Sequence, residues 1–181
     1  MFTPKPIGFI RSPFTDTKTI PKGLGVRHDE EGVLEILAEF EPGLADIEGF
    51  SHLFVIWAFD RSEGYQLFGK SPTDDRPHGV FATRSPRRPN PIALTVVELL
   101  GREGRNLRVR GLDMLDGTPI LDIKPYMSSV PAEKLRRGWL KLRRAGRTTL
   151  PDEYASHIVT VKVSRSTGNR QLSAISRPLT P

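Results

Sequence analysis

The chain has 181 residues, of which 37% are hydrophobic and 27% charged, a composition typical of a soluble globular domain with or without an appendage. The absence of cysteine excludes a disulfide framework, a thiolate zinc site and a cysteine nucleophile. Neither a membrane-spanning apolar run nor an export signal is evident, so we expect a cytoplasmic protein with no membrane contact.

The net charge of +6 is unevenly distributed. Residues 1–126 hold 16 Lys and Arg against 18 Asp and Glu, whereas residues 127–181 hold 11 against 3. A basic excess in the last third indicates a polyanion partner, nucleic acid above all, with a solubilising basic tail as the alternative.

The first part of the chain reads mostly as strands. Residues 5–12 alternate and predict a first strand, and residues 32–40 fit both a strand and a helix. Residues 41–50 predict a short helix with an early proline and a glycine at its end. Residues 51–60 are an almost unbroken apolar run, which predicts a strand covered on both faces.

The strand pattern continues to residue 126. Residues 79–83 and 92–100 predict two strands on either side of a cationic loop, and residues 107–112 predict a half-exposed strand. The Asp-Gly pair at 116–117 predicts a hairpin that leads into a strand over 119–126. Short strands joined by Gly and Pro turns predict a mainly β protein, built as a single small antiparallel β-barrel with short helices.

We expect a change of character after residue 126. Apolar residues at helical spacing among Arg and Lys predict a basic amphipathic helix over 131–145, and residues 157–164 alternate as a strand. The predicted organisation is therefore a barrel domain over 1–126 and a basic helix-strand extension over 127–181. The helix fits either an RNA contact or a dimer contact, and its candidate RNA-binding residues are Arg136, Arg137, Arg143 and Arg144.

Several classes of site have no sequence signal. No glycine fingerprint for dinucleotides follows a predicted strand, and there is no P-loop or nucleophile elbow. The four histidines are scattered without ligand spacing, so no metal site is predicted. One of them, His52, is more typical of a structural histidine than of a catalytic base.

The loop between residues 83 and 92 is the strongest candidate site. Its arginines are interleaved with prolines; the arginines are Arg84, Arg87 and Arg88. Guanidinium groups bind carboxylates and phosphates through paired donors, and prolines lower the entropy lost when a loop is held in place. The pattern indicates a preorganised pocket for an anion, with three ordinary surface arginines as the alternative.

The predicted strand over 119–126 carries a second polar group. Asp122 and Lys124 lie on the same side of a strand, for which a surface ion pair is the simplest interpretation. Asp116 is interpreted as the turn residue of the Asp-Gly pair.

Four strings of the sequence are similar to a known family. They are IGFIRSPF, FSHLFVIWAF, GVFATRSPRRPNPI and DGTPILDIKPY, in this order. Their order and spacing resemble the TrmO, or YaeB-like, family of tRNA methyltransferases over residues 5 to 126. The resemblance implies an all-β barrel that forms homodimers and binds S-adenosyl-L-methionine near the subunit contact. It implies methylation of the exocyclic nitrogen of threonylcarbamoyl-adenosine next to the anticodon of tRNA.

The resemblance also implies roles for single residues. The cofactor-binding residues would be Leu24, Gly25, Val26, Arg84, Arg88, Asp122, Ile123, Lys124 and Pro125. Arg84 and Arg88 would also serve anionic groups of the substrate, and we expect Arg87 to bind the substrate or RNA. The transferred methyl group replaces a proton on nitrogen, and we expect Asp122, or Tyr126 through water, to accept that proton.

Two departures from the family pattern keep other functions open. Residues 21–25 read PKGLG where many members have RQPG, and the basic extension does not match the C-terminal domain of long bacterial members. The alternatives are a non-catalytic RNA-binding barrel and a methyltransferase for another RNA or a small molecule.

Overall fold

The structure is a computed structural model that describes residues 3–21, 28–71, 74–127, 130–131, 134 and 160–161. The described residues form two compact units. The first, the barrel unit, takes in the described residues of Met1–Ala58 and Ala93–Leu150. The second, the small unit, takes in Phe59–Ile92 and a short strand near residue 160.

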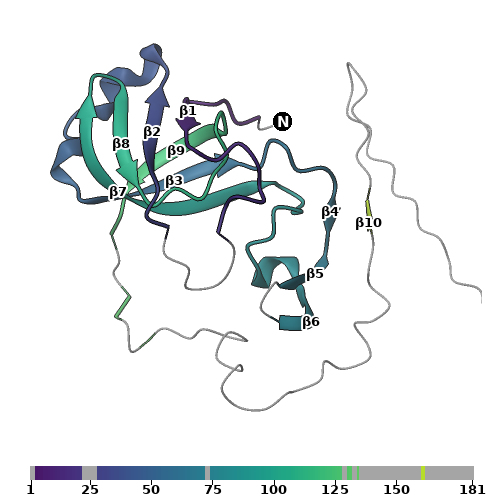
Figure 1. The fold of residues 1–181 in the computed structure, drawn as a ribbon. Helices are drawn as coiled ribbons and strands as arrows, with labels where there is room; N and C mark the ends of the chain where they lie inside the picture. Colours follow the sequence, from purple (N-terminus) through teal and green to yellow (C-terminus); the bar gives the residue numbers. More distant parts are fainter. Residues whose placement is uncertain are drawn as a thin grey trace, which may run out of the picture. The chain divides into compact units, whose positions relative to one another are not determined.

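Six strands form a closed barrel in the order β1-β2-β8-β7-β3-β9 (Figure 1). The strands are β1 (Gly8–Arg11), β2 (Glu31–Ile36), β3 (His52–Ala58), β7 (Ile92–Glu103), β8 (Asn106–Arg110) and β9 (Pro119–Pro125). The pairs β1–β2, β1–β9, β2–β8, β3–β9 and β7–β8 are antiparallel. The predicted antiparallel barrel is therefore confirmed.

Apolar side chains fill the barrel because alternate residues of each strand point inward. The side chains that are at most 1% exposed include Ile10, Leu34, Ile36, Leu53, Val55, Val97, Leu107, Val109 and Ile120. These positions are two apart on β2, β3 and β8, as the alternation in the sequence predicts. Closure pairs both edges of every long strand, which removes exposed sheet edges.

Gly32 allows β1 and β2 to approach closely. A Cβ atom at this position would overlap the carbonyl oxygen of Arg11 and the Leu112 side chain. Since one of these neighbours is backbone, only the absence of a side chain permits the packing.

The segment that fits both strand and helix divides into one of each. β2 ends at Ile36, and the 3-10 helix η1 (Ala38–Leu44) follows, with a second, η2 (Ile47–Gly49), after it. The predicted short helix over 41–50 is thus present as parts of two 3-10 helices.

Two expectations about the barrel strands are wrong. β3 is fully buried on one face only, since Phe54 and Ile56 on its other face are half-buried. The Asp-Gly pair does not make a hairpin, because β8 lies between β2 and β7 whereas β9 lies between β1 and β3. Asp116 is nevertheless a turn residue, and its carboxylate accepts a hydrogen bond from the Ser12 N–H at 3.1 Å.

The small unit contains short strands. They are β4 (Tyr65–Gln66), β5 (Phe68–Ser71) and β6 (Asp74–Gly79), followed by the 3-10 helix η3 (Val80–Ala82). β5 pairs with β6, and β10 (Thr160–Val161) pairs with β4, both antiparallel. The predicted strand over 157–164 is therefore present in its described part, and the predicted helix over 131–145 lies largely outside the described residues.

The predicted strand over 79–83 is wrong. Its glycine ends β6, and Val80–Ala82 form η3, in which the Thr83 N–H donates to the Val80 carbonyl at 3.1 Å. In this turn Val80 is buried while Phe81 is 77% exposed. An apolar run of this length does not distinguish a strand from a tight helical turn.

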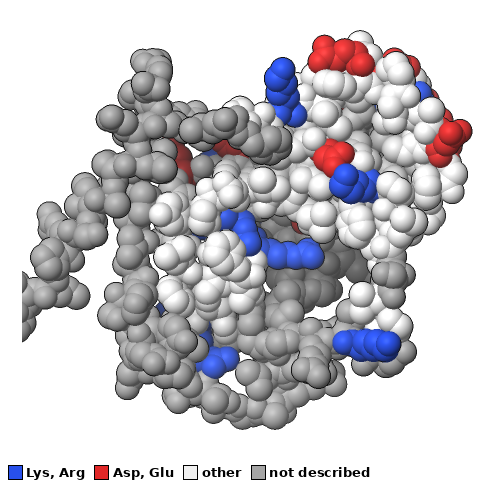
Figure 2. All heavy atoms as spheres, turned by 180° about the vertical axis from the view of Figure 1, so that it is seen from behind, with Lys and Arg blue, Asp and Glu red and all other residues white. Residues whose placement is uncertain are grey.

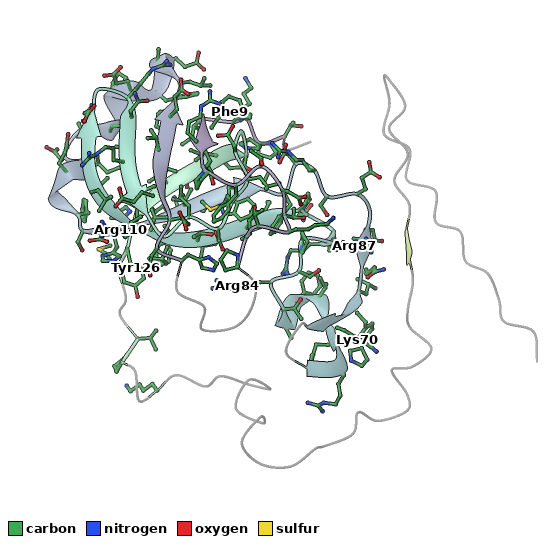
Figure 3. All side chains as sticks on the ribbon, viewed as in Figure 1. Phe9, Lys70, Arg84, Arg87, Arg110 and Tyr126 are labelled. Atoms are coloured by element: carbon green, nitrogen blue, oxygen red, sulfur yellow. The ribbon has the colours of Figure 1, made fainter. Side chains whose placement is uncertain are left out.

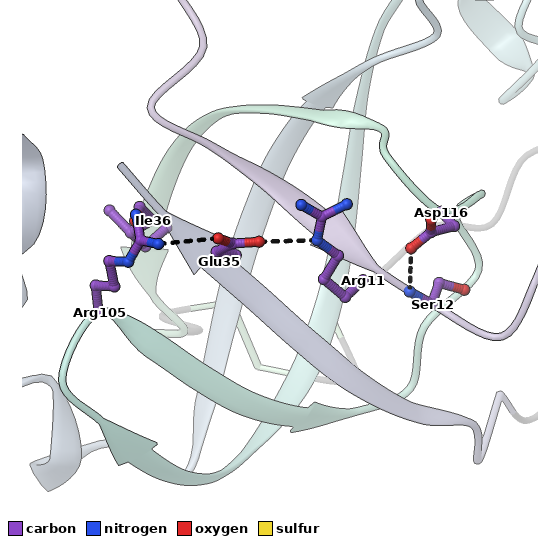
Figure 4. A network of polar contacts seen from close by, with 6 residues as sticks. All are labelled: Arg11, Ser12, Glu35, Ile36, Arg105 and Asp116. Carbon is purple, nitrogen blue, oxygen red and sulfur yellow. Dashed lines mark hydrogen bonds and ion pairs between the residues drawn. The ribbon is translucent and has the colours of Figure 1, made fainter. Parts of the chain in front are cut away.

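Arginine–glutamate pairs connect neighbouring strands of the barrel. Glu35 accepts from Arg11 Nε at 2.8 Å and from Arg105 Nη2 at 3.1 Å (Figure 4). Arg110 contacts Glu31 at 2.7 Å and Glu98 at 3.0 Å. Hydrogen bonding to Glu35 raises the pKa of Arg11, and hydrogen bonding to Glu31 raises the pKa of Arg110.

Candidate functional site

β9 presents a carboxylate and an amine at the surface of the barrel. Asp122 Oδ2 lies 2.6 Å from Lys124 Nζ, with side chains that are 44% and 61% exposed. The Ile123 N–H donates to Asp122 Oδ1 at 2.9 Å. The predicted ion pair is confirmed, and both carboxylate oxygens have a donor that holds them in place.

Tyr126 follows β9 directly and packs against β3. Its N–H donates to the His52 carbonyl at 3.0 Å, and its ring centroid lies 5.0 Å from that of Phe54 and 6.3 Å from that of His52. The Nδ1 atom of His52 lies 3.0 Å from the Ser51 hydroxyl oxygen. Tyr126 remains 44% exposed, so the phenol is both oriented and at the surface (Figure 3).

In the small unit, Arg88 binds its own loop. Its Nη1 donates to the carbonyls of Val80 at 2.9 Å and Thr83 at 2.8 Å, and its guanidinium lies 5.9 Å from the Phe81 ring centroid. The side chain is half-buried. Arg88 therefore connects the end of the loop to η3 and contributes to the preorganisation that the prolines predict.

Arg84 and Arg87 are exposed on the same loop (Figure 3). The backbone beneath them is held, because the Gln66 N–H donates to the Arg87 carbonyl at 3.2 Å and the Ser62 hydroxyl to the Pro86 carbonyl at 3.1 Å. Within the part of the chain that the structure describes, neither guanidinium has a carboxylate at ion-pair distance. The loop thus presents two cations on a fixed backbone, available to an external anion.

The structure gathers the predicted site residues into two groups. Asp122 to Tyr126 lie together on the barrel unit, and the three loop arginines lie together on the small unit. The remaining predicted residues lie outside the described ranges; they are Leu24, Gly25, Val26, Arg136, Arg137, Arg143 and Arg144.

A third polar group was not predicted from the sequence. The Trp57 indole N–H donates to the Thr95 hydroxyl at 3.1 Å, and that hydroxyl donates to Asp113 Oδ1 at 2.7 Å. Trp57 is 6% exposed and Thr95 is 8% exposed. The one sequence signal is a threonine between the apolar inward-facing residues Ala93 and Val97 of β7, and this pattern does not identify its hydrogen-bond partners.

Over the described ranges, no helix is long and apolar enough to cross a membrane. The same residues contain no group of three or more His, Cys, Asp and Glu side chains that could hold a metal ion.

Comparisons with known proteins match the greater part of the chain. Residues 9–132 match the family described as tRNA-methyltransferase O N-terminal domain. A Pyrococcus abyssi protein named "Probable S-adenosyl-L-methionine-binding protein" is 47% identical over 138 residues, which are 76% of this chain and 75% of that protein. The tRNA (adenine(37)-N6)-methyltransferase of Escherichia coli is 38% identical over 135 residues, 67% of this chain and 56% of that protein.

A solved structure described as a crystal structure of TrmO has the same fold. It superposes with a TM-score of 0.63 at 37% identity, over 76% of this chain and 64% of that chain. This chain therefore spans only part of several relatives, just over half of the Escherichia coli enzyme among them.

Proposed function

Because the chain belongs to the family of the tRNA-methyltransferase O N-terminal domain, we propose that it is an S-adenosyl-L-methionine-dependent tRNA methyltransferase. Its target is the exocyclic nitrogen of the adenosine next to the anticodon, in the threonylcarbamoyl-modified form. The observation that carries the proposal is the match over residues 9–132, which includes both the arginine loop and β9. A cytoplasmic location, where tRNA is modified, follows from this activity.

The described residues fit the cofactor by their chemistry. S-adenosyl-L-methionine supplies an electrophilic methyl group on a sulfonium and carries a carboxylate, an amine and ribose hydroxyls. Arg84 offers an exposed guanidinium for the carboxylate, and Asp122 offers acceptor oxygens on a fixed strand. The proposed site binds the cofactor through Leu24–Val26, Arg84, Arg88 and Asp122–Pro125. Arg88 contributes by holding the loop in place through its hydrogen bonds to the Val80 and Thr83 carbonyls.

The proposed role of Asp122 is to accept the proton that leaves the substrate nitrogen. Its two donors, the Ile123 N–H and Lys124, fix the carboxylate while each oxygen keeps a further lone pair. Tyr126, oriented by Phe54, is the second candidate and would act through a water molecule. Arg87 binds the anionic substrate.

The proposed assembly is a homodimer. Leu94 and Val96 on the outer face of β7 are 42% and 40% exposed and form part of an apolar stripe. Such a stripe on a closed barrel fits a second copy of the chain better than solvent. Light scattering on the wild type should give the dimer mass, and a double variant Leu94→Glu/Val96→Glu should give the monomer mass.

The proposed domain organisation keeps the boundary at residue 126, with residues 127–181 as a basic RNA-binding extension. In the full chain, replacing Arg136, Arg137, Arg143 and Arg144 by Ala should weaken tRNA binding and flatten its salt dependence. Unchanged affinity and salt dependence would remove these residues from the RNA contact.

The decisive experiment uses the purified chain with S-adenosyl-L-methionine and tRNA that carries threonylcarbamoyl-adenosine but not the methyl group. Nucleoside mass spectrometry should then detect the methylated nucleoside, and calorimetry should detect cofactor binding without RNA. If the chain methylates only tRNA whose adenosine lacks the threonylcarbamoyl group, the proposed substrate is wrong. A folded chain that binds tRNA but no cofactor would instead be a non-catalytic RNA-binding barrel.

A further inference from the structure

Phe81 is an aromatic side chain that the cofactor and proton-transfer roles do not use. At 77% exposure it is the most exposed large apolar side chain among the described residues. Single exposed apolar residues are common on protein surfaces. Phe81 differs from such residues in how firmly its backbone is held and in which side chains surround it.

The backbone at Phe81 is fixed on both sides. The carbonyl of the preceding Val80 accepts from the Thr83 N–H at 3.1 Å, the Thr83 hydroxyl at 2.9 Å and Arg88 Nη1 at 2.9 Å. The Val80 N–H donates to the Leu67 carbonyl at 2.8 Å, and Val80 itself is buried. A ring on such a turn loses little conformational entropy when it binds a partner.

The surroundings of the ring are cationic. The Arg88 guanidinium lies 5.9 Å from the ring centroid, and the exposed Arg84 and Arg87 follow within the same loop. The loop over residues 83–92 contains these three arginines and no Asp or Glu. An exposed aromatic ring beside guanidinium groups matches single-stranded RNA, whose bases stack on aromatic side chains while its phosphates bind arginine.

We propose that Phe81 is a stacking platform for an unpaired base of the RNA substrate, with Arg87 binding an adjacent phosphate. The inference rests on the proposed function and deepens it by naming a residue that holds the single-stranded loop of the tRNA. Apolar contact with a second copy of the chain is the other use of an exposed ring, but it would not need flanking cations.

The test measures binding of the full chain to an anticodon stem-loop RNA that carries 2-aminopurine in its loop. In the wild type the fluorescence should be quenched on binding, because the base stacks. Phe81→Ala and Phe81→Leu should each weaken binding by about tenfold and lose the quenching, since leucine keeps apolar area but not the aromatic face. Phe81→Trp should keep both, and Phe50→Ala, which removes a 40% exposed ring on the barrel unit, should behave as the wild type.

Three results would overturn the proposal. In the first, Phe81→Leu binds the RNA as tightly as the wild type. In the second and third, Phe81→Ala keeps its RNA affinity but loses S-adenosyl-L-methionine affinity or changes its oligomeric mass. The proposed function fails in a different way. If the wild type binds the stem-loop through Phe81 but transfers no methyl group, the methyltransferase proposal fails and the stacking proposal stands. If the wild type methylates tRNA but its RNA binding does not depend on Phe81, only the stacking proposal fails.

Discussion

The barrel strands and the loop over residues 83–92 of the small unit use arginine differently. On the barrel, Arg11, Arg102, Arg105 and Arg110 each contact a glutamate at 2.7–3.1 Å. Acidic and basic side chains accordingly lie next to one another over the barrel, at the upper right of Figure 2. On the small unit, the arginine loop leaves Arg84 and Arg87 with no carboxylate at ion-pair distance in the described residues and turns Arg88 toward backbone carbonyls.

This difference separates structural charge from charge that is available for binding. Exposed ion pairs between strands contribute little stability and leave little potential for a ligand. Guanidinium groups held on a fixed loop without acidic neighbours keep their full attraction for carboxylate and phosphate groups. The comparison therefore predicts that substitutions in the two units affect different measurements.

The largest effect is expected at an ion-paired residue of the barrel, because the proposed mechanism gives its carboxylate a catalytic role. Asp122→Asn should lower kcat by about 100-fold or more, since the amide cannot accept the proton. Steady-state methylation with saturating tRNA and S-adenosyl-L-methionine measures the change. Asp46→Asn, at an exposed aspartate with no capping hydrogen bond, should leave kcat unchanged. If Asp122→Asn keeps the wild-type kcat, the proton passes elsewhere, and Tyr126→Phe becomes the variant to measure.

The second effect concerns packing, which should differ between the two units. Gly32→Ala should lower the free energy of unfolding by about 1–3 kcal/mol, because the new methyl group meets the Arg11 backbone. Gly69→Ala on the small unit should leave stability unchanged or slightly raised, because a Cβ added there would have no heavy atom within 4 Å apart from its chain neighbours. Urea denaturation measures both, and equal effects would mean that the barrel is no more tightly packed than the small unit.

The third effect is expected at Arg84, one of the two loop arginines without a carboxylate at ion-pair distance in the described residues. Arg84→Ala should weaken S-adenosyl-L-methionine binding by about tenfold or more, the usual loss for a hydrogen bond to a charged group. Arg108→Ala, an exposed arginine of β8, is the matched control and should bind the cofactor normally. Calorimetric titration distinguishes the two, and equal affinities in both variants would remove Arg84 from the cofactor site.

The smallest effect is expected for the paired charges. Glu35→Gln removes the negative charge that pairs with Arg11 and Arg105. It should lower the midpoint of thermal unfolding only slightly, because the Arg11 and Arg105 side chains are 54% and 41% exposed and Glu35 itself is 28% exposed. The raised pKa of Arg11 means that its contribution is present at neutral pH and is lost only at strongly alkaline pH. A large loss of stability in Glu35→Gln near neutral pH would contradict the small contribution expected of these ion pairs.

Much of the barrel could be predicted because strand alternation is a local property. The strands over 5–12, 92–100 and 119–126 were recognisable from apolar periodicity and turn residues alone. The prolines around the loop arginines likewise indicated a preordered loop, and Arg88 does bind two carbonyls near it.

Other features depended on contacts between distant residues. The strand pattern, the basic last third and the family strings can be identified in the sequence, because each lies in consecutive residues. The folded chain alone shows that β8 and β9 have different neighbours, that Thr95 links Trp57 to Asp113, and that Phe81 faces solvent. Pairing partners and exposure result from barrel closure, which joins residues far apart in the chain and therefore leaves no local signal.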